Sequence, residues 1–249
     1  FGFFYGILLN RIKGDEMLIA TYVGYSFTAF MCIAYLILPY KNPVSVLSYS
    51  GRGLSQQVPV ADYWMKSKVL ENGTKITEGL LNNFLSISIL GVRIPVGMFL
   101  IFALMAFIVW AFFKTKTGTA MTAVGSNPEY ARASGININR VRLVSVIFST
   151  VLAAVGIIIY QQSYGFIQLY QAPLAFTFQT VAALLIGGAS INKASIPNVI
   201  IGTFLFQGVI TLTPTVINGA LNIDISEILR MIITNGMIIY ALTRRSKDE

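Results

Sequence analysis

The sequence predicts an all-α integral membrane protein, a polytopic bundle of about six transmembrane helices plus the remnant of another at the N-terminus. Hydrophobic residues make up 55% of its 249 positions and charged residues only 11%, whereas soluble domains carry about 25% charged residues. The mean hydropathy of +0.70 agrees with this. The apolar runs are continuous rather than alternating, which is typical of membrane helices and not of membrane barrels.

The first apolar run, FGFFYGILL at residues 1–9, is too short to cross a bilayer, which takes roughly 20 residues. It lacks the basic start and the small-residue cleavage site of a signal peptide. We expect it to be the end of a span that begins upstream, so that residues 1–249 form one transmembrane domain that is incomplete at its N-terminus.

Six longer apolar runs each predict a membrane span. The fourth and fifth are shorter than ideal, which indicates helices that are tilted, broken or shielded by neighbours. The predicted spans are residues 17–38, 96–113, 143–160, 175–189, 197–212 and 227–242.

The placement of Lys and Arg predicts the orientation. Two short connections, residues 161–174 and 213–226, carry none, and the alternate connections are basic. Basic connections face the cytoplasm, so the loop at residues 114–142 and the C-terminus are expected to be cytoplasmic. The basic residues concerned are Arg11, Lys13, Lys114, Lys116, Arg132, Arg140, Arg142, Lys193, Arg244, Arg245 and Lys247.

The connection at residues 39–95 is then an external loop, although it too contains basic residues. Long loops carry little weight in the charge rule. Its content of Gly, Pro, Ser and Gln indicates a partly ordered external cap, and residues 76–90 are expected to form a short amphipathic helix at the interface.

Composition excludes several functions. The net charge of +8 is explained by topology rather than by nucleic-acid binding. The single cysteine, Cys32, permits neither a disulfide within the chain nor a cysteine metal site, and the sequence has no histidine to act as proton shuttle or metal ligand. We therefore expect a chain that is not an enzyme, with no catalytic residue, no metal site and no cofactor of its own.

The polar stretch TGTAMTAVGSNPEYARASGI, residues 117–136, predicts a short closed helix at residues 128–134. Ser126 or Asn127 can accept hydrogen bonds from its first N–H groups, and Pro128 suits the first helical position. Glu129 in the first turn complements the helix dipole, and Gly135 ends the helix in a left-handed conformation.

A second turn is expected at residues 119–124, divided from the first helix by Gly125. Helices this short are marginal alone in water, so they must pack against their own protein or against a partner, and the residues alone leave that choice open. The small side chains that permit close approach are Ala120, Ala123, Ala131, Ala133 and Ser134.

The pattern K-T-x-x-G-x-x-x-x-A-x-G-x-N-x-x-x-A-R-x-S-G-I, residues 114–136, resembles the cytoplasmic loop of ABC-importer permeases of the ribose and simple-sugar family, a broad family that includes nucleoside and branched-chain amino acid permeases. The stretch VAALLIGGASI at 181–191 resembles the family's apolar run ending in paired glycines. IITNGMIIYALTRR resembles its closing span. The resemblance covers roughly residues 94–245.

The resemblance implies that this loop is a coupling helix, which docks in a groove of a separate ATPase subunit. This chain has no GxxxxGK[ST] pattern, so ATP and Mg²⁺ belong to that partner. The coupling residues carried over from the family are Gly118, Gly125, Asn127, Pro128, Glu129, Ala131, Arg132, Ser134 and Gly135.

The function implied is import of a simple sugar of the ribose or galactose type across the cytoplasmic (inner) membrane, with a second permease subunit and an extracytoplasmic substrate-binding protein. A nucleoside or branched-chain amino acid permease is the alternative within the family. A secondary transporter or channel is the alternative from another class, although the scarcity of intramembrane carboxylates argues against it.

Neutral polar and glycine residues at membrane depth are the candidates for a translocation path. Each could instead bridge helices or allow them to pack closely. They are Gln179, Thr180, Gly187, Gly188, Thr234 and Asn235.

Overall fold

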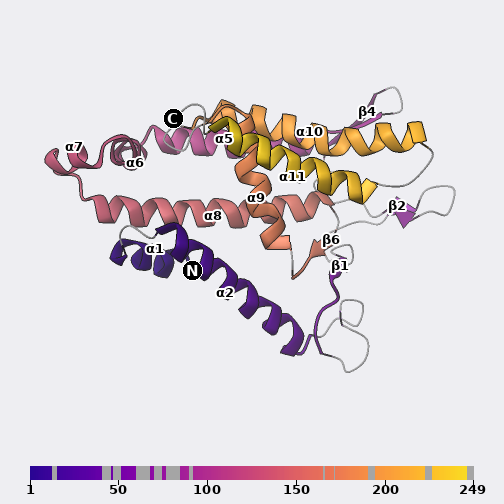
Figure 1. Ribbon diagram of the computed structural model, residues 1–249, viewed down its shortest axis with the longest axis horizontal. Helices are drawn as coiled ribbons and strands as arrows, with labels where there is room; N and C mark the ends of the chain where they lie inside the picture. Colours follow the sequence, from indigo (N-terminus) through magenta and orange to yellow (C-terminus); the bar gives the residue numbers. More distant parts are fainter. Residues whose placement is uncertain are drawn as a thin grey trace. The chain divides into compact units, whose positions relative to one another are not determined.

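The structure, a computed structural model, describes most of the chain and divides it into two compact units, residues Phe1–Tyr170 and Gln171–Glu249 (Figure 1). Each unit is described by itself. The residues described are 1–12, 16–40, 46, 52–59, 68–69, 75–76, 85–89, 92–164, 166–170, 172–189, 194–221 and 226–245.

Helices dominate both units, which confirms the predicted all-α polytopic class. The helices of the first unit are α1 (Gly2–Arg11), α2 (Glu16–Ile37), α5 (Val96–Phe113), α6 (Lys116–Ser126), α7 (Pro128–Ala133) and α8 (Ile138–Tyr164). Those of the second are α9 (Ala172–Ile186), α10 (Ile196–Leu221) and α11 (Ser226–Arg245).

Within the described residues, four helices are long and apolar enough to span a membrane, so the predicted number of six is not confirmed. Helix α9 has 15 residues, about 22 Å at 1.5 Å per residue, which is less than the roughly 30 Å of a hydrocarbon core. Helix α11 is the more polar of the two remaining candidates, with Glu227 and Arg230 near its start. The four spans are Leu18–Ile37, Val96–Phe113, Ile138–Ser163 and Ile196–Thr213.

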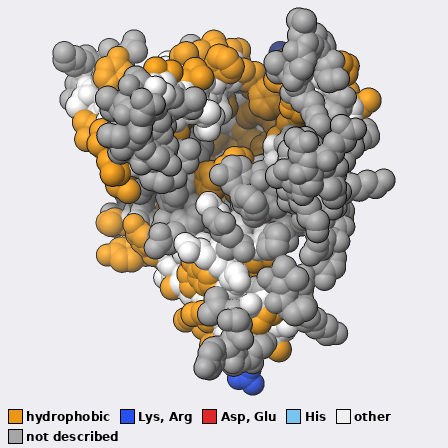
Figure 2. All heavy atoms as spheres, turned by 90° about the vertical axis from the view of Figure 1, so that its right-hand side faces the viewer, with side chains coloured by type: hydrophobic (Ala, Val, Ile, Leu, Met, Phe, Trp, Pro, Cys, Tyr) orange, Lys and Arg blue, Asp and Glu red, His pale blue; other side chains and the backbone are white. Residues whose placement is uncertain are grey.

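Large hydrophobic side chains cover the outside of the long helices. Phe204 of α10 is 79% exposed and Phe99 of α5 is 64% exposed. Most side chains coloured by type in Figure 2 are likewise hydrophobic. A continuous apolar surface of this kind is typical of protein that contacts lipid.

Helix α10 runs nine residues past the predicted end at residue 212, into the connection predicted at 213–226. The prediction ended the helix before Pro214. A proline removes one backbone hydrogen bond, and membrane helices tolerate that loss where neighbouring groups compensate. The apolar residues Val216 and Ile217 then continue the helix to Leu221.

The described part of the loop at residues 39–95, which the sequence predicts to be external, contains strands rather than the predicted helix. Lys75–Ile76 forms β3 and Ser86–Ile89 forms β4, so the amphipathic helix expected at 76–90 is wrong at these positions. Residues 77–84 and 90 lie outside the described residues. The alternation Ser-Ile-Ser-Ile in β4 has the period of two that favours a strand.

Three antiparallel pairs make up the described strands. Strand β2 (Lys68–Val69) pairs with β3, and β4 pairs with β5 (Val92–Pro95) at the start of α5. Strand β1 (Gln57–Pro59) pairs with β6 (Phe166–Gln168), which follows α8. The last pair joins the loop to the end of a membrane-spanning helix.

Two tyrosines connect the same loop to other parts of the first unit. The Tyr170 hydroxyl donates a hydrogen bond to the Leu54 carbonyl oxygen at 2.6 Å, and the Leu54 N–H donates to the Tyr35 carbonyl oxygen at 2.9 Å. The rings of Tyr35 and Tyr170 meet edge to face at 5.7 Å. Burial raises the pKa of the Tyr170 hydroxyl, which keeps it protonated as a donor. These contacts join the loop at Leu54 to α2 and to the residue pair that follows β6.

Helix α1 packs along the first half of α8 through two buried glycines. A Cβ atom on Gly2 would lie 2.1 Å from the Thr150 hydroxyl oxygen, and one on Gly6 would lie 2.6 Å from Leu143 Cδ1. The Asn10 side-chain amide donates to the Asn139 carbonyl oxygen at 2.8 Å. The run at residues 1–9 thus forms a helix that is fixed to a membrane-spanning neighbour.

The second unit has its own small core. Ala182 and Ala183 of α9 are buried against Phe206 and Ile210 of α10. Ile186 of α9 and two residues of α11, Ile233 and Met237, pack around this cluster. Because the side chains at the α9 positions are small, the helix axes can approach closely.

Candidate functional site

The polar segment begins with a sharp reversal after α5. The Thr115 hydroxyl donates to the Phe112 carbonyl oxygen at 2.6 Å and accepts from the Gly118 N–H at 3.3 Å, so Thr115 closes α5 and caps α6. Gly118 is buried where α6 turns back: a Cβ there would lie 2.4 Å from the Phe112 carbonyl oxygen and 2.5 Å from Phe113 Cα. The reversal therefore requires glycine at this position.

Helix α6 is longer than the turn predicted at residues 119–124, and Gly125 does not divide it from α7. Gly125 lies within α6, and a Cβ there would have no neighbour within 4 Å. Glycine in a helix costs only about 1 kcal/mol relative to alanine. Burial of Val124 against the rest of the segment offsets such a cost.

Asn127 is the residue that separates the two helices. Its extended backbone, with φ −153° and ψ 98°, ends α6 and starts α7. Its side-chain oxygen accepts from the Tyr130 N–H at 3.0 Å, Pro128 follows at the first helical position and Glu129 lies in the first turn. The predicted cap and helix start are confirmed, with Asn127 rather than Ser126 as the cap.

The end of α7 is closed as predicted. Gly135 has φ +80°, the left-handed conformation that glycine adopts without strain. Its N–H donates to the Arg132 carbonyl oxygen at 3.0 Å, and the Ile136 N–H donates to the Ala131 carbonyl oxygen at 3.0 Å. The Ser134 hydroxyl donates to the Tyr130 carbonyl oxygen at 3.0 Å. These bonds satisfy carbonyl groups that a short helix would otherwise leave free.

One face of α7 packs against its own protein, and the other is open. Ala131 is only 1% exposed, at the contact with α6 and α8. Tyr130 is 71% exposed, and the ion pair between Glu129 and Arg132, at 3.4 Å, is also exposed. The structure thus shows that α7 packs against its own protein through its inner face, while its outer face is exposed. Packing of that outer face against a partner stays a prediction.

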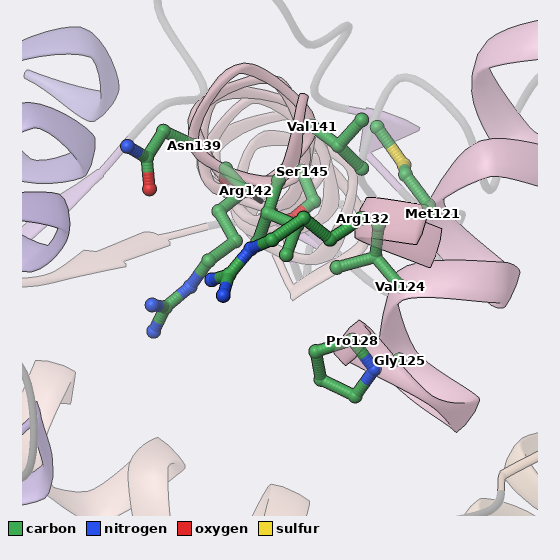
Figure 3. A pocket seen from close by; sticks show the side chains of 10 residues that line it. Met121, Val124, Gly125, Pro128, Arg132, Asn139, Val141, Arg142 and Ser145 are labelled. Atoms are coloured by element: carbon green, nitrogen blue, oxygen red, sulfur yellow. Dashed lines mark hydrogen bonds between the residues drawn. The ribbon is translucent and has the colours of Figure 1, made fainter. Parts of the chain in front are cut away.

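A hollow of about 460 Å³ lies between α6, α7 and the start of α8 (Figure 3). The side chains of Arg132 and Arg142 extend to the same side of α8, with Pro128 and Gly125 opposite them. The residues that line it are Met121, Val124, Gly125, Pro128, Arg132, Ile138, Asn139, Val141, Arg142 and Ser145.

The start of α8 connects this segment to the N-terminal helices. The Arg142 guanidinium forms an ion pair with the Glu16 carboxylate at the start of α2. Asn139 accepts the hydrogen bond from Asn10 of α1. The first turns of α8 therefore contact α1 and α2 as well as α6 and α7.

Replacing Asn127 with alanine should loosen α7 without unfolding the protein. Loss of the acceptor for the Tyr130 N–H costs about 1 kcal/mol, so amide hydrogen exchange over residues 128–134 should become about fivefold faster in the full-length protein. Asn127→Ser keeps a capping oxygen and should exchange close to the natural rate. Equal exchange in the Ala and Ser variants would show that the cap contributes nothing.

The candidate path residues all lie in the second unit. Gln179 and Thr180 lie in α9, where the Thr180 hydroxyl donates to the Phe176 carbonyl oxygen of its own helix at 2.6 Å. Thr234 and Asn235 lie in α11, which contacts α9. Their part in a translocation path stays a prediction.

The paired glycines have distinct local roles at the end of α9. Gly188 has φ +85° and ends the helix. Gly187 meets α10 closely, since a Cβ there would lie 2.0 Å from the Asn198 carbonyl oxygen and 2.9 Å from Gly202 Cα. Gly187 thus allows the close packing that the sequence offered as an alternative to a place in the path, and Gly188 ends the helix.

Sequence reasoning missed three features of this region. Tyr130 was not selected, although an aromatic residue in a polar loop is a usable signal. Asn137 caps α8 by accepting from the Arg140 N–H at 3.1 Å, and its position just before an apolar run could have indicated this. The ion pair between Glu16 and Arg142 joins residues far apart in sequence, and no sequence signal indicates it.

Comparison with known proteins agrees with these observations. Residues 1–242 match the family described as "Branched-chain amino acid transport system / permease component". The chain is 29% identical over 205 residues to the autoinducer 2 import system permease protein LsrC of Enterobacter sp. (strain 638), which covers 81% of this chain and 55% of that protein.

Two further relatives carry related names. The ribose import permease protein RbsC of Haemophilus influenzae is 28% identical over 185 residues, 70% of this chain and 53% of that protein. The probable ABC transporter permease protein YphD of Escherichia coli is 30% identical over 159 residues, 61% of this chain and 46% of that protein. The chain spans about half the length of these curated relatives. No solved structure matches it. Because the family match covers nearly the whole sequence, the chain belongs to this family of ABC-importer permeases.

Proposed function

We propose that this chain is part of the membrane subunit of an ATP-binding cassette importer, with α6 and α7 as the segment that couples it to an ATPase. The observation that carries the proposal is the geometry of α7. It is capped at both ends, held on one face by Ala131 and open on the other at Tyr130, between two helices that are long and apolar enough to cross a membrane.

The partners follow from this role. An ATPase subunit would contact the open face of α7 from the cytoplasm and would hold the ATP and Mg²⁺. A second permease subunit, identical or related, would complete the pathway, and an extracytoplasmic binding protein would deliver the solute. The chain would lie in the inner membrane with its C-terminus in the cytoplasm, as the basic connections indicate.

A simple sugar of the ribose or galactose type is the proposed substrate. The named relatives of known substrate import ribose and autoinducer 2, which supports a sugar-like solute. The family description names branched-chain amino acids, so these are the second candidate, and nucleosides remain the alternative from the sequence resemblance. Family membership favours an importer subunit over a secondary transporter or channel.

Two substitutions, one in α7 and one just after its end, test the coupling role. Gly135→Pro is incompatible with φ +80° because proline requires φ near −65°, and Glu129→Lys reverses an exposed charge. Both should abolish copurification of the full-length permease with its ATPase and reduce ATP-driven uptake at least about tenfold. Gly135→Asn, which tolerates a left-handed conformation, and Glu129→Gln serve as matched controls.

Retention of both ATPase binding and uptake in Gly135→Pro and Glu129→Lys would rule out the coupling role. The substrate is tested separately by uptake of labelled ribose in competition with galactose, leucine and adenosine. Competition by leucine alone would replace the sugar with the second candidate and leave the coupling role untouched.

A further inference from the structure

The hollow between α6, α7 and α8 is lined by cationic and hydrogen-bonding groups on one side. Arg132 and Arg142 contribute guanidinium groups, and Asn139 and Ser145 contribute an amide and a hydroxyl. Among the described residues, no carboxylate lines the hollow. A guanidinium binds phosphate oxygens with two parallel hydrogen bonds, so two of them in one hollow form a site suited to a phosphate group.

A smaller hollow of about 220 Å³ adjoins the same residues. It is lined by Arg132, Ile136, Asn137, Ile138 and Asn139. Arg132, Ile138 and Asn139 belong to both hollows. The Arg132 guanidinium can therefore be reached from two sides.

Each of the two arginines forms an ion pair with a glutamate, and each pair is exposed enough for a phosphate to compete with the carboxylate. Glu129 pairs with Arg132 at the surface, where the side chains are 80% and 63% exposed. Glu16 pairs with Arg142, and these side chains are 43% and 34% exposed. Exposed pairs are weak, so a phosphate with a full charge can compete with either carboxylate.

The length of α8 places this hollow at the level of lipid headgroups. The apolar span Ile138–Ser163 has 26 residues, about 39 Å at 1.5 Å per residue, whereas the hydrocarbon core is about 30 Å thick. The excess of about six residues fits the basic first turns of α8, which hold Arg140 and Arg142. Arginine at this depth attracts anionic lipid.

The opposite wall of the hollow is apolar. Met121 and Val124 of α6 and Ile138 and Val141 of α8 are its apolar lining residues, and Figure 3 shows Met121 and Val141 close to each other. A free phosphate ion or a protein carboxylate has no apolar atoms that would be buried against such a wall. The glycerol and upper acyl carbons of a phospholipid would bury against it, so a lipid matches both sides of the hollow.

We infer that this hollow binds the headgroup phosphate of an anionic phospholipid, with Arg132 and Arg142 as its ligands and the α6 wall against its glycerol region. The lipid would lie between the coupling segment and the start of α8. It would thus stabilise the contact through which α6 and α7 reach α1 and α2. The inference depends on the membrane location of α8 and not on the identity of the transported solute.

The test measures lipid retention by the full-length permease in neutral detergent, by native mass spectrometry. Phosphatidylglycerol is the probe, phosphatidylcholine is the neutral lipid and inorganic phosphate is the free anion. Phosphatidylglycerol should be retained over phosphatidylcholine. Arg132→Gln or Arg142→Gln should each weaken its retention about fivefold, and the double variant about 25-fold.

Two variants separate this site from its surroundings. Arg140→Gln removes an exposed charge from the same turn of α8 that does not line the hollow, and it should weaken retention much less than either variant of the hollow. Glu16→Gln removes the competitor of Arg142 and should strengthen retention. If Arg142 only supported the fold through Glu16, the Glu16 variant would not bind more lipid.

Three results would overturn the inference. One is a loss of phosphatidylglycerol retention in Arg140→Gln as large as in Arg132→Gln or Arg142→Gln. That result would indicate that the lipid binds to the general positive charge of the surface. Another is displacement of the lipid by millimolar inorganic phosphate, which would indicate a site for the free ion. The third is displacement by the bound ATPase, which would assign the two arginines to carboxylates of that partner.

Discussion

Replacing Gly202 with alanine is expected to separate α9 from α10 and to destabilise the C-terminal unit. A Cβ at this position would lie 2.0 Å from the Ala183 carbonyl oxygen and 2.8 Å from the Gly187 nitrogen. Both atoms belong to the backbone and cannot turn aside as a flexible side chain would. Overpacking costs typically 1–3 kcal/mol, and we expect about 3 kcal/mol here. The midpoint of thermal unfolding should fall by roughly 6–12 °C.

Gly208→Ala is the matched control. Gly208 lies on the same helix, and a Cβ there would have no neighbour within 4 Å, so this variant should be neutral or more stable. Gly187→Ala should destabilise as Gly202→Ala does, and the double variant should cost less than the sum because the two glycines face each other. Indistinguishable thermal midpoints for Gly202→Ala and Gly208→Ala would refute the close contact of α9 with α10.

Local chemistry explains why the ends of α7 could be predicted. The cap at Asn127, the proline at the first position and the left-handed Gly135 act within a few residues of each other. Each is a preference of the residue itself. The membrane class could also be predicted, because an apolar run of about 20 residues is typical of a helix that crosses a bilayer.

The errors arose where packing or a longer pattern decides the outcome. Gly125 was taken as a break, but one glycine costs a helix little when Val124 beside it is buried. Residues 86–89 alternate with a period of two, which should have outweighed the expectation of a helix over the longer run. The predicted span at 197–212 ended two residues before Pro214, although membrane helices accept proline.

Contacts between distant segments could not be predicted at all. Gly118 was selected because the resemblance included it, yet its physical reason is the backbone of Phe112 and Phe113. The pair formed by Glu16 and Arg142 depends on how α2 meets α8. One sequence with no relatives beside it carries no information on such a pairing.

Replacing Gly118 with alanine is expected to uncouple the segment formed by α6 and α7 while the rest of the protein stays folded. The new Cβ would meet the Phe112 carbonyl oxygen at 2.4 Å and Phe113 Cα at 2.5 Å. Helix α6 would have to leave the end of α5 and would lose the cap that Thr115 provides. Amide exchange over residues 116–126 should rise, and ATP-driven uptake should fall at least about tenfold, since a displacement of about 1 Å at a positioned contact can cost this much or more.

Gly125→Ala provides the contrast within the same helix. It adds one methyl group to α6 in open space, so α6 should become more stable by about 1 kcal/mol. If the amides of α6 exchange faster in Gly118→Ala but not in Gly125→Ala, the faster exchange results from the disturbed reversal after α5 and not from a change in helix propensity. Gly125→Ala could also abolish uptake even though the amides of α6 exchange more slowly. A partner would then have to approach α6 at Gly125, and the contact surface would extend from α7 onto α6. If Gly118→Ala neither exchanged faster nor lost uptake, the tight reversal at Thr115 would be wrong.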